Sequence, residues 1–156
     1  MAKSLNEYKA VFIDFDDTLC VRLVHEGNPE YYKKMLVGDR NYYINESVFM
    51  PGVGCRNLLR KLRTVDVYCL TWADSDIAKT SMQAFIDFYF CGMVKDTIVT
   101  GTREGKVKFL EMYANANDIR HEDILLVDDY PDTRREAFNK GFGIMSASEV
   151  AVRYGE

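Results

Sequence analysis

The stretch AVFIDFDDTL, residues 10–19, decides how the rest of the sequence is interpreted. Its first half is a short apolar run with β-branched and aromatic residues, which is typical of a buried strand. Its second half places Asp14 and Asp16 two residues apart and is followed by Thr18. Residues two apart on a strand point the same way, so we expect both carboxylates on one side of the strand's carboxyl end.

Four more short apolar runs follow, at residues 65–70, 97–100, 124–127 and 142–145. Apolar residues recur at helical spacing between them, in residues 53–63, 75–89, 106–116 and 132–140. Strands that alternate with helices predict βαβ units and a mostly parallel sheet covered on both faces. We therefore expect an α/β fold, a three-layer α/β/α Rossmann-like sandwich with a mostly parallel five-stranded sheet.

Composition and length exclude several classes of protein. The chain of 156 residues is typical of one domain, and we assign residues 1–156 to a single core domain. Its apolar runs are far shorter than the roughly 20 residues of a transmembrane helix, and residues 1–15 lack the apolar centre of a signal peptide. A net charge of −4 without a basic block argues against general nucleic-acid binding.

The cysteines indicate the compartment. Four cysteines are scattered without a CxxC pair and accompany only two histidines, which argues against a zinc site or a disulfide framework. We interpret them as reduced thiols of a cytoplasmic protein.

Residues 20–50 are the least patterned part of the chain, and we expect them to form a short cap or flap insert. The segment favours a short helix near residues 29–36 and a flap or hairpin around residues 41–49. One interpretation is an aromatic lid packed on the core. The alternative is that Lys33, Lys34 or Arg40 contacts an anionic substrate.

Polar side chains follow the ends of several predicted strands. Ligands of open parallel sheets bind beyond the carboxyl ends of the strands, so we expect these side chains to share one crevice. Each residue alone has a structural explanation: aspartates and threonines cap helices, a lysine is usually solvated, and a tryptophan usually packs. The candidates are Asp14, Asp16, Thr71, Trp72, Lys106, Asp128 and Asp129.

The carboxylates in this set predict a metal site. Asp14, Asp16 and Asp129 would bring like charges together, which is costly unless a cation neutralises them. Mg²⁺, which binds carboxylate, water and phosphate oxygens, fits such a crevice. Asp128 or Asp132 could also reach the ion, although we favour Asp129 as the main ligand.

Residues 10–19 resemble the first signature motif of the haloacid dehalogenase (HAD) superfamily, an apolar strand followed by Asp-x-Asp-x-Thr. Residues 65–71 resemble the second motif, which ends in Thr or Ser, and Lys106 resembles the lysine of the third. Residues 124–132 resemble the acidic fourth motif, so four motifs occur in the family's order. One departure is Asp17, which stands where the family frequently has Gly.

The resemblance implies a Mg²⁺-dependent phosphatase, a phosphomonoester hydrolase of minimal-cap type that acts through an aspartyl-phosphate intermediate. Asp14 would be the nucleophile, and Asp16 the general acid and then the general base. Asp14, the backbone carbonyl of Asp16 and an acid of the fourth motif would hold Mg²⁺. The expected substrate contacts are Thr18, Thr71, Trp72 and Lys106.

A minimal cap leaves the crevice open, which by family analogy favours a larger phosphorylated substrate. A phosphoprotein or a phosphorylated nucleic-acid end would fit, as would closure of the crevice by a second subunit. The physiological substrate and the oligomeric state stay open. The alternative function is a catalytically weak HAD-fold protein that binds phosphate or acts as a regulator.

Overall fold

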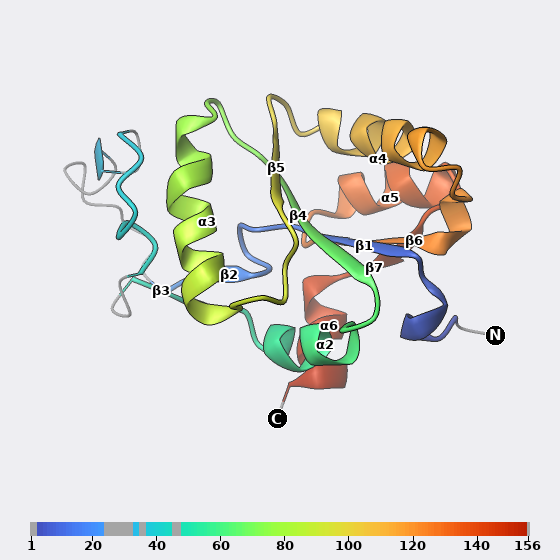
Figure 1. Cartoon of the computed structure of the whole chain (residues 1–156), viewed down its shortest axis with the longest axis horizontal. Coiled ribbons are helices and arrows are strands. Elements are labelled where there is room, and N and C mark those ends of the chain that lie inside the picture. Colours follow the sequence, from blue (N-terminus) through green and yellow to red (C-terminus); the bar gives the residue numbers. More distant parts are fainter. Residues whose placement is uncertain (1–2, 24–32, 35–36, 45–47, 156) are drawn as a thin grey trace.

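The computed structural model describes residues 3–23, 33–34, 37–44 and 48–155. At its centre lies a five-stranded sheet in which all neighbouring strands are parallel (Figure 1). In spatial order the strands are β5 (Thr97–Thr100), β4 (Asp66–Trp72), β1 (Ala10–Ile13), β6 (Ile124–Val127) and β7 (Gly143–Met145). The predicted parallel sheet is confirmed, and β5 and β6 have the expected bounds.

The central strand β1 shows why an almost uninterrupted apolar run is needed here. Successive side chains point to opposite faces of the sheet. Val11 and Ile13 therefore join one hydrophobic cluster, Ala10 and Phe12 join another, and all four are fully buried. The sheet is thus covered on both faces.

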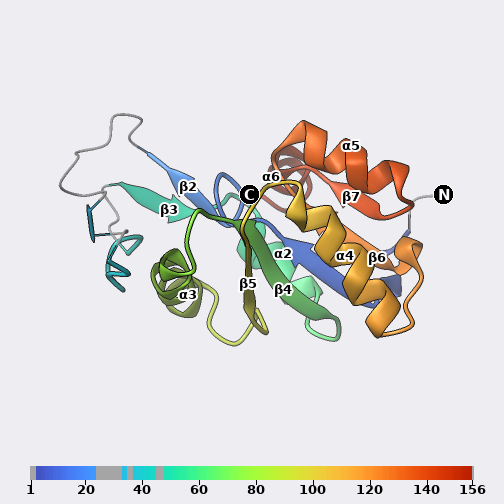
Figure 2. The same cartoon turned by 90° about the horizontal axis from the view of Figure 1, so that it is seen from above.

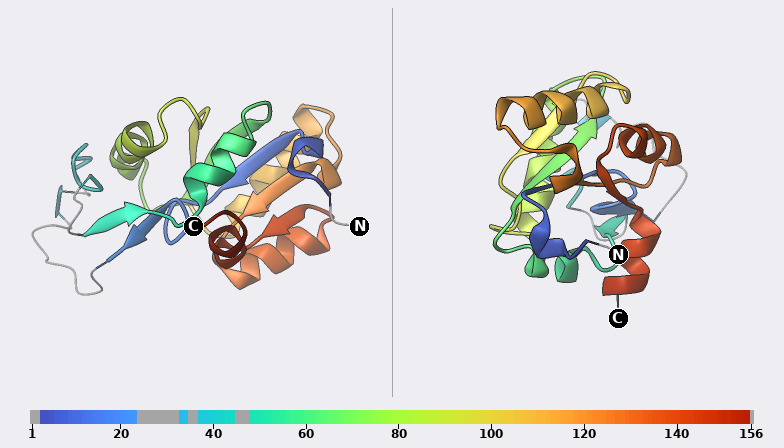
Figure 3. Two further views of the ribbon diagram at one scale, coloured as in Figure 1. Left: turned by 90° about the horizontal axis from the view of Figure 1, so that it is seen from below. Right: turned by 90° about the vertical axis from the view of Figure 1, so that its right-hand side faces the viewer.

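The helices form the two outer layers (Figure 3). One cluster combines apolar residues of α2 (Cys55–Lys61), α3 (Ile77–Tyr89) and α6 (Ala147–Tyr154) with one face of the sheet. The other cluster combines α4 (Gly105–Ala116) and α5 (Pro131–Asn139) with the opposite face. Two short 3₁₀ helices, η1 (Leu5–Glu7) and η2 (His121–Asp123), precede β1 and β6. The three-layer α/β/α sandwich is confirmed.

The insert begins and ends in an antiparallel pair, β2 (Cys20–Arg22) with β3 (Phe49–Pro51). Figure 2 shows this pair projecting from the sheet on the side of α3. A hairpin was expected around residues 41–49, but the paired strands are residues 20–22 and 49–51. Most of the expected helix at residues 29–36 lies outside the described residues.

The described residues agree with two further expectations. None of their helices is long and apolar enough to cross a lipid bilayer. The cysteines are free thiols rather than disulfides, three of them buried and one exposed: Cys20, Cys55, Cys69 and Cys91.

Candidate active site

A cavity of about 440 Å³ lies at the carboxyl ends of the central strands. Asp14 follows β1, Asp128 follows the adjacent strand β6, and Lys106 is the second residue of α4. The described residues that line the cavity include six aspartates and three basic residues. It brings together seven of the predicted residues: Asp14, Asp16, Thr71, Trp72, Lys106, Asp128 and Asp129.

The loop after β1 turns sharply, so that Asp16 comes back towards the crevice. The Asp14 N–H donates to the Val127 carbonyl at 2.9 Å, which extends the sheet pairing by one residue. Asp17 has a φ of 58°, in the left-handed region that glycine favours. Aspartate tolerates this region better than most residues, which explains how it occupies a position where the HAD family frequently has Gly.

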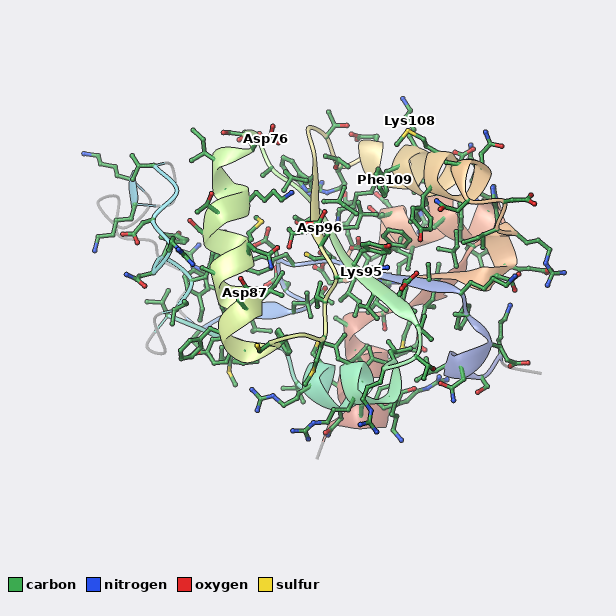
Figure 4. The ribbon with its side chains drawn as sticks, in the orientation of Figure 1. Asp76, Asp87, Lys95, Asp96, Lys108 and Phe109 are labelled. Atoms are coloured by element: carbon green, nitrogen blue, oxygen red, sulfur yellow. The ribbon has the colours of Figure 1, made fainter. Side chains whose placement is uncertain are left out.

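Lys106 links two buried carboxylates. Its Nζ atom donates to Asp14 Oδ1 at 2.7 Å and to Asp128 Oδ2 at 2.8 Å. Burial raises the pKa of Asp14, Lys106 acts in the opposite direction, and Asp128 and Asp129 raise it further. Burial acts to lower the pKa of Lys106, but its two carboxylate partners outweigh this effect and raise the pKa. Lys108, two residues along α4, points away into solvent (Figure 4).

The two adjacent acids of the fourth motif differ in their partners. Asp128 is fully buried, and both of its oxygens are used by the protein: Oδ1 accepts the Tyr130 N–H at 2.9 Å, and Oδ2 accepts from Lys106. Asp129 is half-buried and lines the cavity. Carboxylate oxygens of Asp14, Asp128 and Asp129 lie within 4.8 Å of one another, close enough to share a metal ion. Asp132 is exposed and pairs with Arg135 at 3.0 Å, outside this group.

Asp16 has the properties of an acid–base group. Water reaches its side chain, yet the crowded crevice removes part of its hydration and raises its pKa to about 6. The charge of Asp17 raises the pKa as well, and Lys106 opposes the rise. A carboxyl group with a pKa near neutrality can both donate and accept a proton at physiological pH.

Two threonine hydroxyls in the described part of the chain are buried without a hydrogen-bond partner. Thr71 Oγ1 belongs to a residue that lines the cavity and is 1% exposed. An unpaired buried hydroxyl is costly, so this position suits an oxygen atom of a ligand. Thr18 Oγ1 is also unpaired, but Thr18 does not line the cavity. Its predicted substrate contact stays a prediction.

Arg103 and Tyr130 line the cavity as well, although the sequence pattern did not single them out. The guanidinium of Arg103 lies over the Trp72 ring at 5.2 Å and over the Tyr130 ring at 4.0 Å. Their signal in the sequence is weak, because Arg103 is a lone charge in a loop and Tyr130 is one of ten tyrosines. Lys33, Lys34 and Arg40 do not line the cavity.

Comparison with solved structures shows which fold this is. A HAD family enzyme from Bacteroides thetaiotaomicron, in complex with magnesium and inorganic phosphate, superposes with a TM-score of 0.59 at 15% identity over 89% of this chain and 93% of that one. A haloacid dehalogenase-like hydrolase from Streptococcus pneumoniae gives a TM-score of 0.55 at 12% identity over 96% and 91% of the two chains.

A putative phosphoglycolate phosphatase from Lactobacillus delbrueckii also gives a TM-score of 0.55 at 12% identity, over 89% of this chain and 85% of that one. No protein-family model matches the sequence, and a search of curated proteins gives no match. The chain therefore has the fold of HAD-family enzymes, with its acidic crevice at the carboxyl ends of the strands.

Proposed function

We propose that this protein is a HAD superfamily phosphatase that hydrolyses phosphomonoesters with Mg²⁺ and forms an aspartyl-phosphate on Asp14. One observation carries the proposal. Buried Lys106 contacts Asp14 at 2.7 Å in the same cavity that the unpaired hydroxyl of Thr71 lines. A carboxylate nucleophile, an ammonium and a free hydroxyl are what a phosphoryl group needs around it.

The balance of charge supports a metal ion. Lys106 supplies one positive charge to a group of three carboxylates, so the group retains an excess of negative charge. Mg²⁺ is a hard cation that prefers oxygen ligands, and it would neutralise the carboxylates and the phosphoryl oxygens together. We assign Asp14, Asp129 and the backbone carbonyl of Asp16 as its ligands. Asp128, whose oxygens are already used, would mainly hold Lys106 in place.

The residues of the cavity then divide the reaction between them. A carboxylate oxygen of Asp14 forms a bond to phosphorus while the ester P–O bond breaks, and Asp16 gives its proton to the leaving oxygen. Asp16 next accepts a proton from water, whose oxygen attacks the same phosphorus and releases phosphate and the Asp14 carboxylate. Thr71 and Lys106 donate hydrogen bonds to the phosphoryl oxygens throughout.

We also assign residues 20–50 as a short cap insert within one core domain. Phe49 of its β2–β3 stem lines the cavity, together with Tyr42 and Tyr43. Tyr43 packs on Phe15 of the core at 4.8 Å and on Phe49 at 4.9 Å between ring centroids. This part of the insert therefore supplies an apolar wall beside the acidic floor of the crevice.

The test is hydrolysis of p-nitrophenyl phosphate by the full chain, with Mg²⁺ and after chelation. We expect activity only with the metal. We expect Asp14→Asn to lower kcat by about 1,000-fold or more, because the nucleophile is lost. The matched control is Asp132→Asn, an exposed acid outside the cavity, which should retain wild-type activity.

Two results would contradict the proposal. Full activity of Asp14→Asn would exclude the aspartyl-phosphate. A wild-type protein that hydrolyses no member of a broad phosphomonoester panel would favour the phosphate-binding or regulatory alternative.

A further inference from the structure

Arg103 occupies a position at the cavity that the proposed reaction does not use. It lies in the loop between β5 and α4, three residues before Lys106. Arg103 is half-buried, whereas Lys106 is only 2% exposed. Its guanidinium carbon lies 5.2 Å from the centre of the Trp72 ring and 4.0 Å from that of Tyr130. Trp72 ends β4 and Tyr130 directly precedes α5, so three separate loops meet around one cation.

The backbone around Arg103 is held tightly. Thr100 Oγ1 donates to the Thr102 carbonyl at 2.8 Å, and Thr102 Oγ1 accepts the Gly105 N–H at 3.1 Å. A Cβ atom on Gly105 would lie 3.2 Å from Thr102 Oγ1 and 3.3 Å from Thr100 Cβ, so the turn packs closely at this glycine. The Lys106 N–H donates to the Arg103 carbonyl at 3.2 Å, which links the backbone of the two residues.

The guanidinium N–H groups of Arg103 have no hydrogen-bond partner in the part of the chain that the structure describes. The guanidinium makes no ion pair or side-chain hydrogen bond there, although six aspartates line the same cavity. The aromatic rings attract its charge but accept none of its N–H groups in the plane of the guanidinium. Arginine in such a setting presents a planar fork that matches a carboxylate or a phosphate.

We propose that Arg103 forms a second anion-binding subsite, so that the preferred substrate is a phosphomonoester that carries a second anionic group, a carboxylate or a further phosphate. This inference rests on the proposed phosphatase function. Lys106 and Thr71 bind the reacting phosphoryl group in the buried part of the cavity. Arg103 binds the second anion closer to the surface, between Trp72 and Tyr130, and thereby orients the substrate.

The test compares substrates that differ in the second group. Glycerol 3-phosphate has none, 3-phosphoglycerate adds a carboxylate, and 1,3-propanediol bisphosphate adds a phosphate. The variants are Arg103→Met, which keeps much of the packing, and Arg103→Lys, which keeps the charge without the planar fork. Arg60→Met is the matched control, because Arg60 is exposed on α2 and does not line the cavity.

We expect the wild type to prefer one or both of the substrates with a second anion by about 10- to 100-fold in kcat/KM, the range of a charge-assisted hydrogen bond. Arg103→Met should remove this preference mainly through KM and leave p-nitrophenyl phosphate hydrolysis within about threefold of wild type. Arg103→Lys should retain part of the preference, and Arg60→Met all of it. Which of the two anionic substrates responds identifies the second group.

Calorimetric binding of the same three compounds to Asp14→Asn with Mg²⁺ should give the same order of affinity, and adding Arg103→Met should abolish that order. Equal affinity of the three compounds, or an equal loss for all of them on Arg103→Met, would overturn the subsite. Failure of the wild type to hydrolyse p-nitrophenyl phosphate, these three compounds or any other member of a phosphomonoester panel would instead overturn the proposed function. The calorimetric comparison decides the subsite in either case.

Discussion

The two ends of strand β6 place aspartates in opposite electrostatic settings. At the amino end, Asp123 is 4% exposed and accepts hydrogen bonds from two cations, Lys3 Nζ and Arg120 Nε, the latter at 3.1 Å. At the carboxyl end, one cation, Lys106, serves both Asp14 and Asp128. Arg120 also pairs with Glu122, so the amino end has two cations for two acids, whereas the carboxyl end has one cation for two, although Asp123 and Asp128 are only five residues apart.

The pKa values follow this difference. Hydrogen bonds from Lys3 and then Arg120 lower the pKa of Asp123, whereas burial, only partly opposed by Lys106, raises the pKa of Asp14. The amino end is an ion-pair cluster that is complete within the chain. The carboxyl end has fewer basic residues than aspartates, and such a deficit of positive charge is characteristic of a site that binds a cation.

The largest expected effect comes from removing Lys106, the cation that pairs with both buried carboxylates. Lys106→Met leaves Asp14 and Asp128 buried without a counterion, so the free energy of unfolding without Mg²⁺ should fall by about 3–5 kcal/mol. Urea denaturation measures this change in the free energy of unfolding. Lys108→Met, on the solvent side of the same helix, should change the free energy of unfolding by less than about 0.5 kcal/mol. Equal losses for the two variants would mean that the carboxyl end has no special charge deficit.

A smaller effect is expected from adding the missing charge. Mg²⁺ at 100 times its Kd should stabilise the folded wild type by about 2.7 kcal/mol, since the unfolded chain has no assembled site. Thermal denaturation with and without Mg²⁺ measures this gain. Asp129→Asn should lose most of it, whereas Asp132→Asn and Asp123→Asn should keep it. A gain that survives Asp129→Asn would assign the metal to other ligands.

The smallest effect is expected at the amino end. Asp123→Asn should lower the free energy of unfolding at pH 7 by about 1 kcal/mol or less, as for other partly solvated ion pairs. Because the pKa of Asp123 is lowered by folding, its contribution is complete above about pH 4, the range of an unfolded aspartate, and is lost as the pH falls through the folded-state pKa.

Unfolding of wild type and Asp123→Asn at pH 7 and pH 3 checks this sign. The difference between the two proteins should be smaller at pH 3 than at pH 7. A difference that is the same at both pH values would come from packing rather than from charge.

The sequence predicted those parts of the fold that burial alone dictates. Residues 97–100 and 124–127 form strands with the expected bounds, and the latter are buried on both faces, so that their apolar runs are uninterrupted. Helix α6 was missed because only Val150 of its eight residues is buried, which leaves a weak apolar pattern. The start of this helix has a signal in the sequence, because Ser146 and Glu149 form a capping box.

Only those residues of the candidate site that directly follow a strand could be predicted from the sequence. Parallel topology brings Asp14, Thr71 and Asp128 to one edge, and the order of the apolar runs implies that topology. Sequence spacing could not show that Asp128 holds Lys106 while Asp129 lines the cavity half-buried, because adjacent residues are distinguished only by packing. The setting of Arg103 also depends on two rings that are 31 and 27 residues away in the chain.

The stem of the insert has a consequence for how this protein can change. Gly52 lies so close to the segment leading into β2 that a Cβ atom would clash with the Thr18 carbonyl oxygen, and its N–H donates to the Leu19 carbonyl at 2.8 Å. The chain that enters the insert and the chain that leaves it are thus joined at the base, beside the loop that follows β1. Doubling the length of a flexible loop in general costs only about 0.6 kcal/mol in closure entropy. Changes of length between β2 and β3 would therefore cost little and would leave the joined base and the acidic crevice beside it in place.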